Sequence, residues 1–211
     1  MQNKNFFRRL ANAFITLRTL YIKPFILKYG AIGEGSWIRT PALIDGSQNI
    51  FLGKYVNIKG GCTILTVGSG RLIMKDYSGA AVGLTAVASN HKRAIGIRER
   101  TNDDNVYRDI IVEEEVSIGA HCTLLAGAHI GRGAIIGAGA VIRGEVPPYA
   151  VVIGNPAKVI GFRYSPEDCI KHESLIYPVA ERISAEILEA NYERFYLSKK
   201  DEIMRFKNIS L

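Results

Sequence analysis

The chain of 211 residues lacks a run of about 18 consecutive apolar residues, the length that a membrane-spanning helix requires. Its N-terminus also lacks the apolar core and small-residue cleavage site of a secretory signal peptide. Cysteine is scarce, and Cys62, Cys122 and Cys169 lie far apart without a CxxC pair. Because such spacing suits neither a disulfide framework nor a zinc clip, we expect a cytoplasmic protein with no metal cofactor.

The composition that is present fits a folded, basic domain. Hydrophobic residues make up 47% and charged residues 22% of the chain, enough for one buried core with appendages. The formal net charge of +7 favours an anionic partner: nucleic acid, a phospholipid surface or a phosphate-bearing small molecule. We expect no nucleic-acid binding, because neither clustered aromatic residues nor a known reader motif accompanies the charge.

An aliphatic residue recurs at every sixth position. The main series is Val112, Ile118, Leu124, Ile130, Ile136 and Ile142, and four of these are preceded at two residues by Cys122, Ala128, Ala134 and Ala140. A second series is Ile32, Ile38, Ile44 and Ile50, and after a slip of two it continues with Leu52, Ile58 and Ile64. A helix would need apolar residues at steps of three and four, and each internal Gly would cost it about 1 kcal/mol. The pattern therefore excludes a helix.

Short strands joined by tight corners fit this period. Glycine at a corner tolerates positive φ, and three strand-corner units of six residues close one coil of a solenoid. The aliphatic side chains then point inward and stack on counterparts about 18 residues along, with Cys62 and Cys122 predicted to be inert core thiols. The segment MKDYSGAA, residues 74–81, fits the repeat poorly and predicts a distorted coil.

The repeat and the segment IIGAGAVIRGEVPPYAVVIGNPAKVIG, residues 135–161, resemble the hexapeptide-repeat acyltransferases. Within them the chain is most similar to the maltose, galactoside and xenobiotic acetyltransferase branch, from about Ile32 to Phe162. This resemblance implies a left-handed parallel β-helix, acetyl-CoA as co-substrate, and a homotrimer with sites between subunits. The acceptor would be a small molecule or a glycan.

Helical segments are expected on both sides of the β-helix. We divide the chain into an N-terminal helical segment (1–29), the β-helix domain (30–162) and a C-terminal helical extension (163–211). The first segment is amphipathic: Phe6, Phe7, Leu10, Phe14, Leu17 and Tyr21 share one face, and Lys4, Arg8, Arg9 and Lys23 lie opposite. It either caps the open end of the solenoid, the role we favour, or makes peripheral contact with a membrane. SPED predicts a helix that starts near Pro166 with Ser165 as its N-cap, and further helices from Pro178 and over ISAEILEANYERF.

One long polar stretch, about residues 90–109, interrupts the repeat. A loop of this length extruded from a regular solenoid is usually functional or disordered. In the family that the chain resembles, such a loop carries the catalytic histidine and reaches towards a neighbouring subunit, which implies that His91 is the general base. Imidazole suits this task, since its pKa lies near neutrality.

The resemblance also implies the remaining site residues. Coenzyme contacts are expected at Ala120, Ala138, Arg143, Lys158 and Arg163, and acceptor contacts at Lys59 and Asp104. Relatives usually carry an aromatic residue at Ser117, Pro-Gly at residues 126–127 and Thr-Lys at residues 143–144, so contacts at the edge of the coenzyme are expected to differ. Lys59 lies near an acceptor-binding Asn of relatives, which leaves the acceptor open.

Several functions remain in competition. The leading interpretation is an O-acetyltransferase acting on a saccharide or polysaccharide precursor. An N-acetyltransferase of an amino sugar or a xenobiotic acetyltransferase would use the same fold and base. A γ-type carbonic anhydrase would need three converging imidazoles, which the spacing of His121 and His129 disfavours. An inactive scaffold is the remaining alternative.

Overall fold

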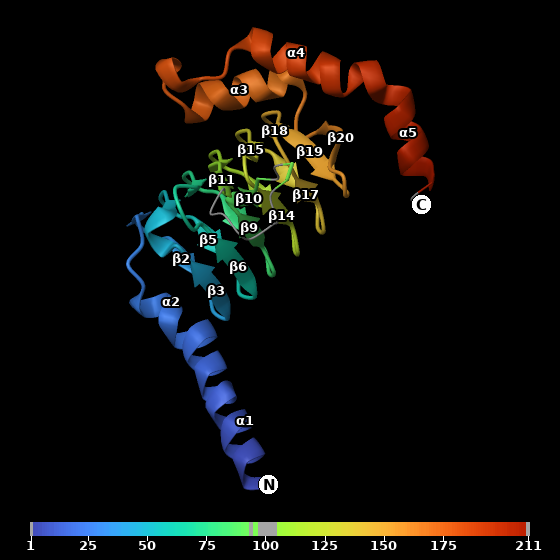
Figure 1. The fold of residues 1–211 in the computed structure, drawn as a ribbon. Coiled ribbons are helices and arrows are strands. Elements are labelled where there is room, and N and C mark those ends of the chain that lie inside the picture. The colour runs from blue at the N-terminus through green and yellow to red at the C-terminus, as the bar shows by residue number, and fades with distance from the viewer. Residues whose placement is uncertain (1, 93–94, 97–104, 210–211) are drawn as a thin grey trace.

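The protein is a β-solenoid with helices at both ends (Figure 1). The computed structural model describes residues 2–92, 95–96 and 105–209. Short strands on three sides of each coil pair in parallel with the coils before and after, which confirms the predicted parallel β-helix. The glycine-rich corners between the strands allow this tight winding, as at Gly61, where φ is 79°.

Three sheets form the walls of the solenoid. The first sheet contains β1 (Ala31–Ile32), β4 (Ile50–Leu52), β7 (Leu72–Met74), β12 (Ile110–Val112), β15 (His129–Ile130) and β18 (Glu145–Val146). The second contains β2 (Trp37–Ile38), β5 (Asn57–Ile58), β8 (Gly79–Ala80), β13 (Ser117–Ile118), β16 (Ile135–Ile136), β19 (Ala150–Ile153) and β20 (Lys158–Phe162). The third contains β3 (Ala42–Asp45), β6 (Cys62–Leu65), β9 (Thr85–Val87), β14 (Thr123–Leu125) and β17 (Val141–Ile142). Strands β19 and β20 pair antiparallel, which ends the solenoid.

The number of residues per coil varies along the solenoid. In the second sheet Ile38 pairs with Ile58 and Ile58 with Ala80, which are steps of 20 and 22 residues. Ile118 pairs with Ile136 and Ile136 with Val152, which are steps of 18 and 16. The predicted spacing of about 18 therefore applies in the middle, and the early coils hold additional residues at their corners, such as the 3-10 turn η2 (Ser47–Asn49).

The inward aliphatic residues form one continuous core. All six residues of the main series are at most 4% exposed, and burial of each contributes about 1.5–3 kcal/mol. Ile32 is 44% exposed because β1 belongs to the first coil and has no coil beneath it. Cys62 and Cys122 are buried as predicted, and burial raises the pKa of the Cys62 thiol to about 11.

The predicted distortion at residues 74–81 is wrong. Met74, Ala80 and Ala86 continue the six-residue step and are all buried. Gly79 pairs in register with Asn57 on one side and Ser117 on the other. Alanine at two inward positions hid the period from a pattern based on large aliphatic residues.

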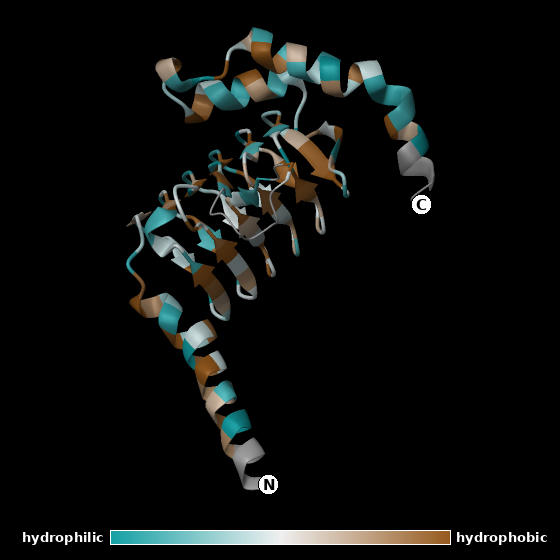
Figure 2. Cartoon of the chain, viewed as in Figure 1, coloured by the Kyte–Doolittle hydropathy of each residue, from teal (hydrophilic) through white to brown (hydrophobic). Residues whose placement is uncertain are grey.

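The N-terminal helix does not cap the solenoid as we expected. Helix α1 (Gln2–Leu17) extends away from the coils, followed by a π-helical segment, η1 (Arg18–Ile22), and α2 (Lys23–Ile26) (Figure 1). The residues that pack against the core from this end are Leu27 and Tyr29, which follow α2. The cap thus comes from η1, α2 and the linker that follows them. The large apolar side chains of α1 from Phe7 onwards are exposed (Figure 2).

The C-terminal helices lie at the other end of the solenoid (Figure 1). They are α3 (Pro166–Ile176), α4 (Ala185–Phe195) and α5 (Lys200–Ile209), with 3-10 turns η3 (Val179–Glu181) and η4 (Leu197–Lys199) between them. Ser165 Oγ accepts a hydrogen bond from the backbone N–H of Asp168 at 3.2 Å, which confirms the predicted N-cap. Across the described residues, none of the helices has both the length and the apolarity needed to span a bilayer.

Candidate active site

The two ends of the segment that interrupts the repeat pair with each other as the strands of a β-hairpin. Strands β10 (Ser89–His91) and β11 (Asn105–Tyr107) pair antiparallel, with His91 opposite Asn105. The hairpin leaves the solenoid after β9 and returns to β12, at the corner between the third and first sheets. His91 is therefore held close to the root of the hairpin, the point where β10 leaves the solenoid, and its side chain is exposed there.

Two interactions fix this root to the coils. The backbone N–H of Arg108 donates to the carbonyl of Ala88 at 3.1 Å. The Asp109 carboxylate accepts from the backbone N–H of Arg71 at 2.9 Å and from its Nε at 3.0 Å. Hydrogen bonds from the Arg71 side chain hold the pKa of Asp109 below its ordinary value. Asp109 thus anchors the return strand of the hairpin.

His91 lines a cavity of about 430 Å³ at this corner. The lining residues come from the hairpin and from the two following coils: Asn90, His91, Val106, Arg108, Ala126, Gly127, Arg143 and Gly144. One imidazole and two guanidinium groups thus share a polar cavity. Glycine is required at the Gly127 corner, where φ is 86°, and an added Cβ would lie 3.3 Å from Cδ of Arg108. The absence of a side chain there makes room for Arg108.

A second cavity, of about 490 Å³, lies between the end of the solenoid and α5. It is lined by Lys158 together with Lys199 and Arg205, and also by apolar and acidic residues that include Glu145. Lys158 Nζ is 3.3 Å from Glu202 Oε1, in an exposed ion pair. Gly144 lines the first cavity and Glu145 the second, so the two cavities are adjacent along the chain.

Ala120 and Ala138 lie at a different corner from His91. They occupy equivalent positions between the second and third sheets on successive coils, and the N–H of Gly139 donates to the carbonyl of Ala120 at 2.8 Å. The third sheet separates this corner from the His91 cavity. Within one chain, the structure therefore brings His91 and Arg143 together but not these two alanines.

The other predicted site residues are dispersed. Lys59 Nζ lies 4.8 Å from the centroid of the Trp37 ring, in the N-terminal coils of the solenoid. The Arg163 guanidinium lies over the Tyr164 ring at 5.0 Å, beside the C-terminal helices. Asp104 lies outside the described residues.

Arg108 is the charged residue of this cavity that sequence reasoning missed. It stands directly after the second strand of the hairpin, where the chain returns to the solenoid. The two ends of a long loop inserted in a solenoid meet at one corner. A basic residue at the end of the loop is therefore expected near a candidate base at its start, and this pattern could have identified Arg108 from the sequence.

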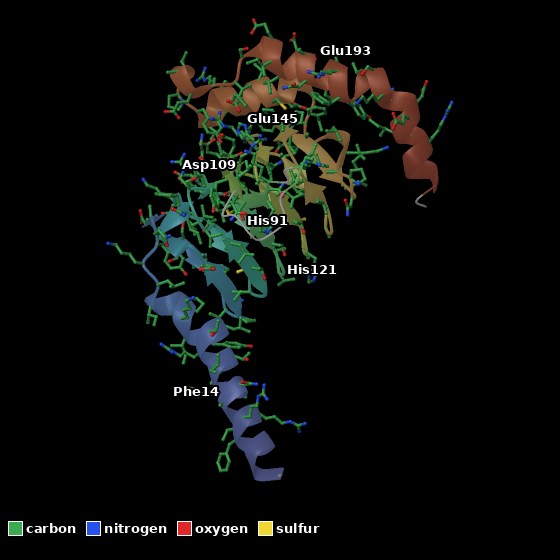
Figure 3. The ribbon with its side chains drawn as sticks, viewed as in Figure 1. Phe14, His91, Asp109, His121, Glu145 and Glu193 are labelled. Carbon is green, nitrogen blue, oxygen red and sulfur yellow. The ribbon has the colours of Figure 1, made fainter. Side chains whose placement is uncertain are left out.

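The remaining described histidines lie apart from this cavity. His129 is bound through both ring nitrogens, by Glu113 at 3.0 Å and Glu145 at 2.9 Å. His121 packs over Gly83 at the corner between the second and third sheets, whereas His91 follows β9 at the other end of the third-sheet strands; Figure 3 labels both residues. His172 pairs with Glu115 at 2.9 Å. Each imidazole thus belongs to a separate part of the surface.

Comparisons with known proteins agree with this fold. Residues 109–144 match the family described as bacterial transferase hexapeptide (six repeats). The chain is 51% identical over 51 residues to 2,3,4,5-tetrahydropyridine-2,6-dicarboxylate N-acetyltransferase of Staphylococcus aureus (strain JH9). That match covers 24% of this chain and 21% of the relative, about a fifth of the relative's length.

Two solved structures share the fold. One is a hexapeptide-repeat-containing acetyltransferase from Vibrio cholerae O1 biovar eltor complexed with acetyl coenzyme A, with a TM-score of 0.59 and 21% identity over 73% of this chain and 78% of that chain. The other is a maltose O-acetyltransferase from Clostridium difficile 630, with a TM-score of 0.59 and 23% identity over 64% of this chain and 71% of that chain.

The three-sheet coil and its six-residue period define a hexapeptide-repeat β-helix protein. Residues 109–144 are similar to the bacterial transferase hexapeptide family, and the coils on either side of this stretch continue the same fold.

Proposed function

We propose that the protein is an acetyl-CoA-dependent acetyltransferase that modifies a hydroxyl group of a saccharide or polysaccharide precursor. The observation that carries the proposal is the position of His91. It stands close to the root of the extruded hairpin, in one cavity with Arg108 and Arg143. Relatives of the same family and fold are acetyltransferases, and one was solved with acetyl coenzyme A bound.

In this mechanism the His91 imidazole takes the proton of the acceptor hydroxyl as its oxygen attacks the thioester carbonyl. A carbon–oxygen bond forms, the carbon–sulfur bond breaks, and the imidazolium returns the proton to the leaving thiolate. No covalent enzyme intermediate is needed. The reaction yields the acetyl ester and free coenzyme A.

The negative charge that develops on the carbonyl oxygen requires a donor. The backbone N–H of Gly127 already donates to the carbonyl oxygen of Asp109 at 3.2 Å, so this amide is not the donor to the oxyanion. The guanidinium groups of Arg108 and Arg143 are the charged donors of the same cavity. We propose that one of them stabilises the oxyanion, which is typically worth a few kcal/mol.

The two adjacent cavities suit a long, thin co-substrate. With its thioester beside His91, the coenzyme can pass residues 144–145 into the second cavity, where Lys158, Lys199 and Arg205 would face its phosphates. Lys158 is paired with Glu202, so phosphate binding would replace a carboxylate partner. Arg163 remains a proposed contact beyond this cavity.

We propose a homotrimer in which the site is completed between copies. In one chain, His91 lies at the carboxyl ends of the strands of the third sheet, and the Ala120–Ala138 corner lies at their amino ends. A neighbouring copy could present its Ala120–Ala138 corner to the His91 cavity. Mixing two inactive variants, His91→Ala and Ala138→Trp, tests this, because hybrid trimers would contain intact sites. Recovered activity supports the shared site, and no recovery in verified hybrids contradicts it.

The direct test of function is thiol release from acetyl-CoA with a panel of sugars, amino sugars and hydroxylated drugs. His91→Ala should lower kcat by about 10² to 10⁴ while the affinity for coenzyme A changes little. His172→Gln is the matched control, since His172 lines neither of the two cavities and should keep near-normal turnover. Unchanged turnover in His91→Ala would remove His91 from the mechanism.

N-acetylation is the second candidate. The 51-residue match to an N-acetyltransferase favours it, because the same base could deprotonate an ammonium group. The panel separates the two: an amide product from amino sugars supports N-transfer, and an alkali-labile ester supports O-transfer.

A further inference from the structure

Most of the net positive charge of the chain belongs to its first 33 residues. This stretch holds six of the 27 Lys and Arg residues and no Asp or Glu, whereas the remaining 21 basic residues face all 20 acidic residues. Six of the seven net charges thus belong to the segment that contains α1, η1 and α2. The rest of the chain is close to neutral.

This basic segment also exposes large apolar side chains. On α1, Leu10 is 57%, Phe14 64% and Leu17 51% exposed, and their spacing of four and three places them on one face of the helix. The apolar exposure continues on α2 with Phe25 at 75% and Ile26 at 70%. Helix α1 projects from the first coil, and Phe14 lies on it far from the solenoid (Figure 3).

Arg8 and Arg9 lie off this apolar face. At about 100° per residue, Arg8 points nearly opposite the face of Leu10 and Phe14, and Arg9 lies to one side of that face. A helix with one apolar face and a basic polar face has the composition of an interfacial membrane helix.

We propose that α1 anchors the protein on the surface of an anionic phospholipid bilayer. Its apolar face would enter the boundary between headgroups and acyl chains, and Arg8, Arg9 and Arg18 would meet the anionic headgroups. Pairing of these helices between copies fits less well, because it would gather positive charges from each segment with no acidic partner in residues 1–33. The charge therefore selects the lipid surface over a second copy of the chain.

The anchor and the proposed active site are separate. Helix α1 leaves the solenoid beside its first coil, whereas the His91 cavity is built from the hairpin and the corners at residues 126–127 and 143–144. Membrane binding can therefore be tested without reference to acetyl transfer.

The test is co-sedimentation of the full chain with vesicles of phosphatidylcholine alone or mixed with phosphatidylglycerol. We expect binding to the mixed vesicles that weakens with salt, and little binding to phosphatidylcholine. Arg8→Gln with Arg9→Gln should lower the partition coefficient about thirtyfold, since each basic residue near an anionic surface contributes about a fivefold factor. Leu10→Ala with Phe14→Ala should lower it at least about tenfold.

Matched controls alter the same residue types elsewhere on the surface. Lys54→Gln with Lys171→Gln removes two exposed cations, and Leu175→Ala with Val179→Ala removes side chains that are 73% and 78% exposed. Both control proteins should bind as the wild type does. The proposal is overturned by absence of binding, by equal binding to both vesicle types, or by equal losses in the controls. It is also overturned if Leu10→Ala with Phe14→Ala lowers the molecular mass in lipid-free solution, which would make this face an interface between copies.

Discussion

Glu173 connects α3 to the solenoid, and its removal should release that helix. The side chain is 1% exposed and its carboxylate accepts from three groups: the Tyr149 hydroxyl, Arg132 Nη1 at 2.8 Å and the backbone N–H of Ile183 at 3.0 Å. Burial, followed by the hydrogen bond to Glu173, raises the pKa of the Tyr149 hydroxyl well above its ordinary value. Tyr149 is therefore a neutral donor to a charged acceptor.

Glu173→Ala leaves the Arg132 guanidinium and the Tyr149 hydroxyl without this acceptor. Breaking a buried charge pair in this way costs about 3–5 kcal/mol. Arg132 also contacts Glu114 at 3.2 Å, which places the expected loss near the lower end, about 3 kcal/mol. Glu173→Gln keeps one oxygen acceptor but loses the charge, and should cost about half as much.

Hydrogen exchange followed by mass spectrometry is the appropriate assay, because α3 can open without global unfolding. Amides of residues 166–176 should exchange about a hundredfold faster or more in Glu173→Ala, with a smaller change in Glu173→Gln. Glu193→Ala, on the exposed surface of α4, is the control and should leave exchange unchanged. Wild-type exchange in Glu173→Ala would refute the view that this carboxylate holds the helix.

Three further predictions follow from the core, the hairpin root and the second cavity. Ile130→Ala removes a fully buried side chain of the inner column and should lower the free energy of unfolding by about 2–5 kcal/mol in urea denaturation, whereas the half-buried Ile135→Ala should cost less. The pKa of Asp109 is lower in the folded state than in the unfolded state, so the ionised carboxylate stabilises the fold at pH values above its unfolded pKa. This contribution to the free energy of unfolding is lost as the pH falls through the folded pKa. Acidification below about pH 4 should therefore lower the melting temperature more in the wild type than in Asp109→Asn. Lys158→Ala should raise the KM for acetyl-CoA and leave kcat unchanged, and a fall in kcat with constant KM would argue against a phosphate contact.

The local periodicity predicted the solenoid well. A six-residue step has one simple physical solution, a strand and a corner, and it identified the inward residues from Val112 to Ile142 without any long-range information. The Ser165 cap and the helices α3 and α4 were predicted equally well, since caps are set by neighbouring residues. The helix expected from Pro178 is wrong, because only the 3-10 turn η3 forms there and α4 begins at Ala185.

The candidate site was harder to predict because it depends on register between coils. Coils of 16 to 22 residues and one extruded hairpin decide which corners meet, and no local pattern states their lengths. His91 and Arg143 share a corner, while Ala120 and Ala138 occupy another. Likewise, the amphipathic pattern predicted the helix α1 but not its position. A helix that covers the end of a solenoid and a helix that lies on a membrane surface have the same amphipathic pattern.

The most direct test of the account is a crystal structure of the assembled protein with coenzyme A. We predict that the thiol sulfur lies in the cavity lined by His91, Arg108 and Arg143, with the phosphates towards Lys158. A sulfur atom bound elsewhere on the solenoid, away from His91 of every copy, would contradict the proposed site of acetyl transfer.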